Sequence, residues 1–173
     1  ATKTGLVASS ALAVYGIAAL LTFALDRGTP TDGLTFSPAF YARDGQLLRL
    51  GLTPDQKYRL WVTLSDLAPV LQESTLIYED RWFYWHPGVN PVALAKAVWH
   101  TYLRRDAVVG ASTITMQVAR LRYGLETRSW RGKLAQILRA LELEWRYSKD
   151  EILEAYLNIA PYGGNIEGAG AAS

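Results

Sequence analysis

The chain has 173 residues, half of them hydrophobic, and a formal charge of only +2, which suits one domain with a sizeable core. This balance argues against disorder and against a nucleic-acid-binding tail. There is no cysteine, so disulfides, thiolate metal sites and thiol nucleophiles are excluded. His86 and His100 are the only histidines, which argues against a histidine-rich metal site.

The first part of the chain, residues 1–27, predicts a transmembrane anchor. No charged residue lies between Gly5 and Leu25, and a helix of this length spans roughly the 30 Å of a hydrocarbon core. A signal peptide, which has a shorter apolar region and a cleavage site after small residues, is the alternative. Lys3 before the span favours a cytoplasmic N-terminus, with the rest of the chain outside.

The segment 28–65 predicts a linker followed by a small β-hairpin. Its first part, as far as Pro38, is rich in Gly, Pro and Thr, which favour turns and loops. Asp44-Gly45 then stands between two short apolar runs, a pattern typical of a hairpin turn.

The remaining residues, 66–173, predict a mainly α domain. Apolar residues recur at helical spacing, and several helix starts carry their own signals. Pro69 and Pro91 suit first helical positions, and Ser148 with Glu151 forms a capping box. We expect one helix that leads up to Glu79 and others over residues 91–104, 113–122, 130–147 and 149–158.

The stretch at residues 79–90, EDRWFYWHPGVN, sets two adjacent carboxylates before several aromatic residues. One interpretation is an ordinary helix end with partly buried side chains. The other is a carboxylate that loses part of its water to aromatic surface and so takes or gives a proton in a reaction. Trp82 and Trp85 fit either a core position or a membrane-facing one.

Positive charge is concentrated between Lys96 and Arg139, where nine Lys or Arg residues stand against two acidic ones. Such a run usually marks a solvated surface or one that faces lipid headgroups. It can equally surround an anionic ligand such as a phosphate. Composition leaves both interpretations open.

The stretch at residues 110–117, GASTITMQ, combines small residues with three hydroxyls and a glutamine. Such residues can line a polar cleft, and a helix N-terminus there would offer free N–H groups to an anion. The plainer alternative is a helix cap, with Ser112 as the capping residue.

Together these stretches resemble the peptidoglycan glycosyltransferases, glycosyltransferase family 51. Their first signature, Glu-Asp-x-x-Phe-x-x-His-x-Gly, is matched by EDRWFYWHPGVN, and their second by GASTITMQ. The fourth resembles SKDEILEAYLN at residues 148–158, and the start of the fifth resembles GGNIEG followed by AAS. The resemblance covers about residues 67–173, and four signatures in the same order are specific.

The resemblance implies a lysozyme-like, α-rich domain with a small β-hairpin, behind an N-terminal transmembrane helix. Members of this family polymerise lipid II, a lipid-linked disaccharide-peptide, into β-1,4 glycan strands and release undecaprenyl pyrophosphate. They invert the anomeric configuration and use a glutamate as general base. The implied location is the outer, periplasmic side of a bacterial cytoplasmic membrane. The implied partners are lipid II, the growing glycan strand, that membrane and other cell-wall synthesis proteins, with no nucleic acid.

The first signature also implies roles for individual residues. Glu79 corresponds to the general base. The other signature positions are candidates for binding substrate or holding the loop: Asp80 as an orienting partner, Phe83, His86 as a hydrogen-bonding residue and Gly88 as the turn.

Later signatures imply contacts to the substrate's sugar and phosphate oxygens. The candidates with hydroxyl or amide groups are Ser112, Thr115 and Gln117. The basic positions implied near the pyrophosphate are Arg120, Arg128 and Lys133, and a guanidinium would suit a phosphate through paired hydrogen bonds.

The chain departs from the family pattern in its third signature. Gln136 stands where the family has a glutamate, and we keep it as a substrate-binding candidate. An amide carries no charge and holds a divalent ion poorly. We leave open a divalent cation, Mg²⁺ or Mn²⁺, that accompanies the pyrophosphate; no other cofactor and no protein metal site is implied. The chain stops at Ser173, inside the fifth signature, so we expect a C-terminally truncated domain.

Two other functions stay open. A lysozyme-like domain with one dominant glutamate would also serve a glycan-cleaving enzyme. A membrane-tethered scaffold that binds lipid II without turnover is the non-enzymatic alternative. The basic stretch favours a pyrophosphate donor over an uncharged glycan.

Overall fold

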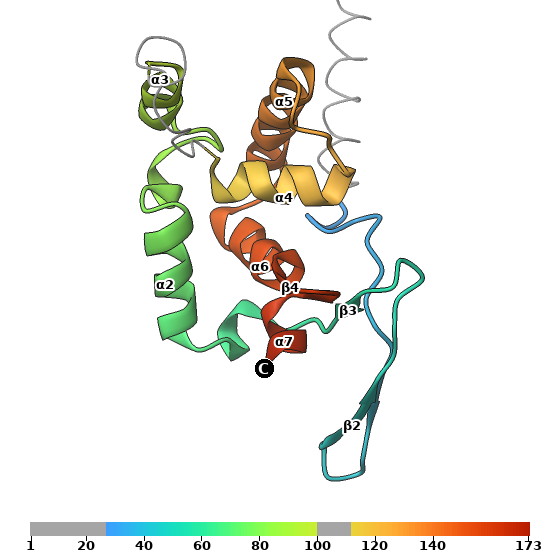
Figure 1. Ribbon diagram of the computed structural model, residues 1–173. Coiled ribbons are helices and arrows are strands. Elements are labelled where there is room, and N and C mark those ends of the chain that lie inside the picture. The colour runs from blue at the N-terminus through green and yellow to red at the C-terminus, as the bar shows by residue number, and fades with distance from the viewer. Residues whose placement is uncertain (1–26, 100–111) are drawn as a thin grey trace, which may run out of the picture.

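The computed structural model describes residues 27–99 and 112–173 (Figure 1). Within these ranges no helix combines the length and the apolar character needed to cross a bilayer. The predicted anchor, residues 5–25, lies outside the described residues. The described elements follow in chain order: β1 Ala39–Tyr41, β2 Leu47–Leu50, β3 Tyr58–Arg59, η1 Leu64–Asp66, α2 Pro69–Glu79, η2 Phe83–Trp85, α3 Pro91–Trp99, α4 Ile114–Tyr123, α5 Trp130–Arg146, α6 Lys149–Ile159, β4 Pro161–Gly163, β5 Ile166–Glu167 and α7 Ala169–Ala172.

The mainly α fold is confirmed, and most helix starts carry the predicted caps. Ser148 and Glu151 form the capping box at the start of α6. Pro69 takes the first position of α2, and Asn90 Oδ1 accepts hydrogen bonds from two backbone N–H groups in the first turn of α3. The expected end of α3, near residue 104, lies outside the described residues.

The start of α4 differs from the plainer alternative for residues 110–117. Thr113, not Ser112, caps this helix, and its hydroxyl accepts a hydrogen bond from Met116 N at 3.1 Å. The helix ends at Gly124, whose φ of 58° and ψ of 38° form a left-handed cap. Ser112 is thereby free of the capping role and half-buried at the entrance to α4.

The core forms where α4 packs against α5 and α6 (Figure 1). α6 is the most deeply buried element, since nearly every residue from Ile152 to Ile159 is buried. α4 adds Ile114, Met116 and Val118, all with no exposed surface. Removal of this apolar surface from water is the main stabilising contribution and fixes the three helices against one another.

The predicted hairpin is present. β1 and β2 pair antiparallel around the turn at Asp44-Gly45, and Figure 1 shows the hairpin projecting away from the helices. A second sheet, in the order β3-β5-β4, joins residues before and after the helices, with β3 parallel to β5 and β4 antiparallel to it.

Residues 27–65 are fastened to the helices by buried polar contacts. Arg59 in β3 forms ion pairs with Glu167 and Asp55 at 2.6 Å. Asn158 in α6 accepts a hydrogen bond from Val62 N and donates one to Val62 O, both at 2.8 Å. The part of this segment that follows the hairpin is therefore held against α6 and β5, while the hairpin itself projects away.

Candidate active site

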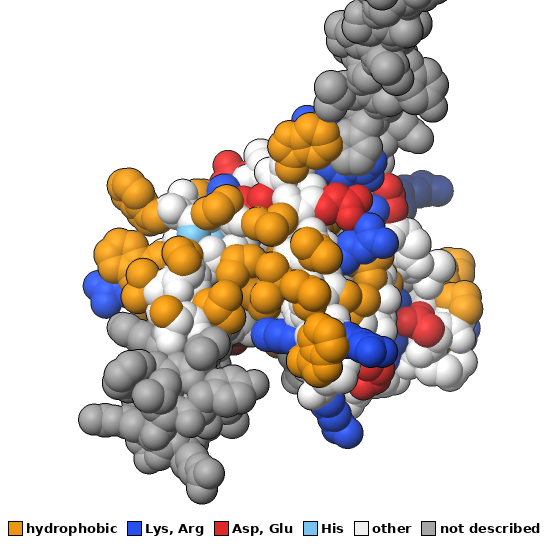
Figure 2. All heavy atoms as spheres, turned by 90° about the horizontal axis from the view of Figure 1, so that it is seen from above, with side chains coloured by type: hydrophobic (Ala, Val, Ile, Leu, Met, Phe, Trp, Pro, Cys, Tyr) orange, Lys and Arg blue, Asp and Glu red, His pale blue; other side chains and the backbone are white. Residues whose placement is uncertain are grey.

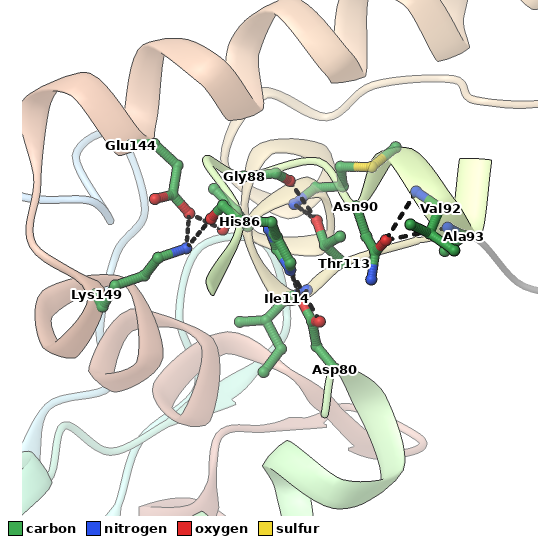
Figure 3. Close-up of polar contacts among 12 residues, drawn as sticks. Asp80, His86, Gly88, Asn90, Val92, Ala93, Thr113, Ile114, Glu144 and Lys149 are labelled. Atoms are coloured by element: carbon green, nitrogen blue, oxygen red, sulfur yellow. Dashed lines mark hydrogen bonds and ion pairs between the residues drawn. The ribbon is translucent and has the colours of Figure 1, made fainter. Parts of the chain in front are cut away.

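The candidate site begins where α2 ends. Glu79 is the last residue of α2, and the chain turns at Asp80, whose φ of −161° and ψ of 76° are not helical. The buried Asp80 carboxylate accepts a hydrogen bond from Ile114 N at 3.1 Å and contacts His86 Nε2 at 2.9 and 3.0 Å (Figure 3). Since Ile114 opens α4, one carboxylate joins the end of α2 to the N-terminus of α4, where an anion is favoured.

A second contact closes the loop between these helices. Thr113 Oγ1 donates a hydrogen bond to Gly88 O at 2.5 Å (Figure 3). Gly88 has a φ of +80°, and a Cβ there would lie 2.7 Å from Glu144 Cγ and 3.0 Å from Ala140 O. Only glycine therefore combines this backbone conformation with close packing of the loop on α5.

The same loop is held by an ion pair between α5 and α6. Lys149 Nζ donates to Glu144 Oε1 and to His86 O, both at 2.7 Å (Figure 3), and lies 4.4 Å from the centre of the Phe83 ring. Thr115 Oγ1 donates to the same Glu144 oxygen at 2.5 Å. These paired polar groups fix the loop residues 80–88 on three helices.

A polar cavity of about 470 Å³ opens beside the end of α2. Tyr78 and Thr127 line it together with half of the predicted site residues, which are Glu79, Ser112, Gln117, Arg120, Lys133 and Gln136. The fold thus brings the expected base, two of the expected cations and the polar candidates into one place.

The cavity is electrostatically suited to an anion. Burial first, and then the neighbouring charge of Arg120, lower the pKa of Lys133 from its ordinary value. Lys133 Nζ donates to Gln136 Oε1 at 2.9 Å, while Gln136 Nε2 donates to Met116 O at 2.6 Å. Because the amide of Gln136 is neutral, it orients Lys133 without cancelling its charge.

Glu79 lies between this cavity and a second one of about 300 Å³. Its exposed side chain accepts a hydrogen bond at Oε2 from Gln117 Nε2 at 2.7 Å. The second cavity is lined by hydroxyl-bearing and aromatic residues, among them Ser74, Tyr156 and Tyr162. Burial is the main cause that raises the pKa values of both tyrosines, so their hydroxyls stay protonated at neutral pH.

The other six predicted residues do not line either cavity at Glu79; they are Asp80, Phe83, His86, Gly88, Thr115 and Arg128. For Phe83 and Thr115 this differs from the expected contact with substrate, because both side chains are packed inside the core. Asp80, His86 and Gly88 hold the loop, as the contacts above describe. Arg128 is exposed in the segment before α5, next to the lining residue Thr127.

The aromatic residues that follow Glu79 in the sequence do not surround its carboxylate. Trp82 and Trp85 are exposed and line a separate, largely apolar cavity of about 570 Å³ next to the start of α3. The turn at Asp80 directs them away from the end of α2. The aromatic residues that line cavities together with Glu79 are Tyr78, Tyr156 and Tyr162, not the tryptophans that follow it in the sequence.

Sequence reasoning missed nine residues that line the two cavities, among them Tyr78, Thr127, Tyr156 and Tyr162. Tyr156 lies in the SKDEILEAYLN stretch, four residues after the buried Ile152 on α6. A tyrosine on an apolar helix face is typical of the core, so the spacing alone gave no reason to place it at the site.

Comparison with known proteins shows the family of this chain. A profile of the transglycosylase family matches residues 44–173. Penicillin-binding protein 1C of Escherichia coli (strain K12) is 47% identical over 132 residues, which cover 76% of this chain and 17% of that protein. Penicillin-binding protein 2D of Bacillus subtilis (strain 168) is 39% identical over 147 residues, 85% of this chain and 21% of that protein. The chain therefore belongs to the transglycosylase family, as the ordered signatures predicted.

The match begins within the hairpin, since residue 44 lies in the turn between β1 and β2. The chain spans only about a fifth of the length of these curated relatives. The similarity to penicillin-binding protein 1C covers most of this chain.

The loop that carries the site gives a first prediction. Gly88→Ala should lower the free energy of unfolding by about 3 kcal/mol, because a positive φ costs ~1–2 kcal/mol and the added methyl group overpacks the loop against α5. Gly45→Ala is the matched control, since Gly45 has a φ of +86° but open space around a Cβ. Urea unfolding of both variants measures the difference. Equal losses would show that close packing at Gly88 contributes nothing.

Proposed function

We propose that this chain is a peptidoglycan glycosyltransferase that polymerises lipid II into β-1,4 glycan strands and releases undecaprenyl pyrophosphate. The observation that carries the proposal is the position of Glu79 between a cationic cavity and an aromatic, hydroxyl-bearing one. Membership of the transglycosylase family supports it. The two cavities correspond to the two substrates that such a reaction must bring together.

In the proposed reaction Glu79 is the general base. The 4-hydroxyl oxygen of the acceptor sugar forms a bond to the anomeric carbon of the donor, while the bond from that carbon to the pyrophosphate breaks. The hydroxyl proton passes to the Glu79 carboxylate, and the bonding electron pair leaves with the pyrophosphate. Attack on the face opposite the leaving group inverts the configuration.

The cationic cavity would bind the pyrophosphate of the donor. Arg120 and Lys133 both line it, and Glu79 is the one acidic residue among the lining residues. The pyrophosphate gains negative charge as the glycosidic bond breaks, so fixed cations stabilise the transition state more than the bound substrate. Ser112 and Gln117 offer further donors to phosphate or sugar oxygens.

The second cavity would hold the acceptor sugar. Tyr156 and Tyr162 present ring surface and hydroxyl groups, and Ser74 and Thr75 add further hydroxyls. This combination of apolar and hydrogen-bonding surface suits a carbohydrate, which has both C–H faces and hydroxyl edges. An acceptor here would lie on the opposite side of Glu79 from the pyrophosphate.

In this proposal a divalent cation, Mg²⁺ or Mn²⁺, can bind together with the pyrophosphate. Among the described residues no group of three or more His, Asp or Glu side chains is arranged to hold a metal ion. Glu79 alone offers a carboxylate in the cationic cavity, and Gln136 is a weak ligand. Such an ion would therefore be held mainly by the pyrophosphate oxygens.

The surface supports the proposed location on the outer side of a bacterial cytoplasmic membrane. α5 lies at the top of Figure 1, and Figure 2, which views that side, shows hydrophobic side chains gathered with Lys and Arg among them. Along α5 the exposed apolar residues recur at helical spacing: Trp130, Leu134, Leu138 and Leu141. Such a face, together with the apolar residues 5–25, would keep the site close to its lipid-linked substrate.

Loss of the base tests the function. Glu79→Gln keeps the size of the side chain but removes the proton acceptor, so polymerisation of lipid II should fall by about 10²–10⁴-fold while lipid II binding is retained. Glu73→Gln, an exposed position on the same helix, is the matched control and should polymerise like wild type. Product analysis separates polymer from cleaved glycan. Polymerisation by Glu79→Gln within about tenfold of wild type would remove Glu79 from its role.

Loss of a cation tests the pyrophosphate site. Arg120→Ala should lower turnover by about 10²-fold and weaken lipid II binding much less, because the guanidinium acts chiefly on the departing charge. Arg49→Ala removes an exposed arginine of β2, far from the site, and should have no effect. Arg128, exposed and outside the lining, should show a smaller loss than Arg120. Wild-type turnover and affinity in Arg120→Ala would contradict the assignment.

A further inference from the structure

Lys133 on α5 lines the cationic cavity, and a buried side chain of the same helix holds its ammonium group. Lys133 Nζ donates a hydrogen bond to Gln136 Oε1 at 2.9 Å. The two residues are three positions apart, a spacing that places side chains next to each other on one helix face. Only 1% of Gln136 is exposed, whereas Lys133 is half-buried.

Gln136 is itself fixed from a second helix. Its Nε2 donates a hydrogen bond at 2.6 Å to Met116 O, in the first turn of α4, and Met116 has no exposed surface. α4 and α5 pack against each other in the core, so this carbonyl group has a well-defined position. Gln136 therefore links the backbone of α4 to the ammonium group of Lys133.

The two partners require an amide between them. Met116 O can only accept a hydrogen bond and Lys133 Nζ can only donate one, so the side chain between them must donate at one end and accept at the other. A carboxylate would accept at both ends and would set an oxygen against Met116 O. An apolar side chain would remove both contacts, which is costly for buried polar groups.

The neutrality of the amide also affects the charge of the cavity. Arg120 and Lys133 line it together, and Glu79 is the one acid among the described lining residues. An ammonium group has three N–H donors, so the hydrogen bond to Gln136 uses only one of them. A carboxylate at this position would instead form an ion pair with Lys133 and repel an anion in the cavity.

We propose that Gln136 is a positioning residue for Lys133: its amide oxygen orients the ammonium group in the cationic cavity and leaves the positive charge available to the departing pyrophosphate. This inference rests on the proposed function, in which the cavity binds the pyrophosphate of the donor. Gln136 takes no proton and forms no bond in the reaction. It acts through the orientation and the charge of Lys133.

The first test is the affinity of the 173-residue chain for inorganic pyrophosphate, measured by isothermal titration calorimetry in EDTA so that only side chains supply positive charge. Gln136→Met should weaken binding about tenfold, because the ammonium group loses its orientation. Gln136→Glu should weaken it about a hundredfold, because it also cancels the charge. Both changes remove the donor to Met116 O, so a purely structural role predicts wild-type affinity in both folded proteins.

Gln72→Met is the matched control. The Gln72 amide on α2 also donates to backbone carbonyls, Leu64 O at 2.8 Å and Leu67 O at 3.0 Å, but it lines neither of the two cavities at the site. This variant should bind pyrophosphate like wild type, although its unfolding midpoint should fall as that of Gln136→Met does. An equal loss of pyrophosphate affinity in the two variants would show that affinity follows stability alone.

A double-mutant cycle tests whether Gln136 acts through the lysine. In a Lys133→Met background, Gln136→Met should cause no further loss of pyrophosphate affinity. A further tenfold loss there would overturn the proposal, as would wild-type affinity in folded Gln136→Glu or a wild-type chain that binds no pyrophosphate.

Lipid II polymerisation is measured on the same proteins, and kcat should fall about tenfold in Gln136→Met, because a misdirected ammonium group stabilises the departing charge less. Wild-type kcat in a Gln136→Met protein that binds pyrophosphate more weakly would contradict the role in turnover. If the wild-type chain fails to polymerise lipid II, the proposed function fails, whereas the pyrophosphate measurements still decide whether Gln136 positions Lys133.

Discussion

The hydrogen bonds of the Asp80 carboxylate are the constraint on which the geometry of the site depends. This side chain is buried, contacts His86 and accepts a hydrogen bond from the first N–H of α4, so the end of α2 and the start of α4 are held at one point. A buried carboxylate without such partners would be costly, which makes this arrangement strongly favoured over alternatives. Glu79 is the residue that precedes Asp80 in the chain. Its exposure at the mouth of the cavity follows directly from the burial of Asp80.

The polar groups that hold the loop differ from those that line the cavity in how they are paired. Buried polar groups around the loop are paired with one another, as Lys149 is with Glu144 and with His86 O. Among the described residues that line the cavity Glu79 is the one acid, and Gln136 supplies a neutral amide to Lys133. Internal pairing stabilises the scaffold, and the positive charge at the cavity suits the anionic substrate proposed above.

Much of the fold could be predicted because its signals are local. Proline at the first position of α2 and the Ser148–Glu151 capping box fix helix starts within a few residues of sequence. The hairpin turn at Asp44-Gly45 is equally local. The choice of Thr113 over Ser112 as the cap of α4 was not predictable, because both hydroxyls can cap and the contact of Thr113 with Gly88 decides between them.

The sequence predicted several residues that line the cavity, but it did not separate them from signature residues that pack elsewhere. The signature positions identified Glu79, Arg120 and Lys133, which do line one cavity. Neighbours in a signature need not face the same way, however, and Phe83 lies in the core although it is only four residues from Glu79. Tyr156 was missed for the opposite reason, since it lines the second cavity with Glu79 but comes from a helix far along the chain. Only tertiary packing sorts lining residues from supporting ones.

The central claim is that the Asp80 carboxylate sets the position of the Glu79 base, and the most direct measurement is the lipid II polymerisation rate of Asp80→Asn. The amide keeps the shape of the side chain but removes its negative charge and replaces with a donor one of the two acceptor oxygens that now serve Ile114 N and His86 Nε2. A displaced base should lower the rate by about 10²-fold, while Asp150→Asn, an exposed carboxylate that accepts from Tyr84, should polymerise like wild type. A wild-type rate in a folded Asp80→Asn protein would contradict the account.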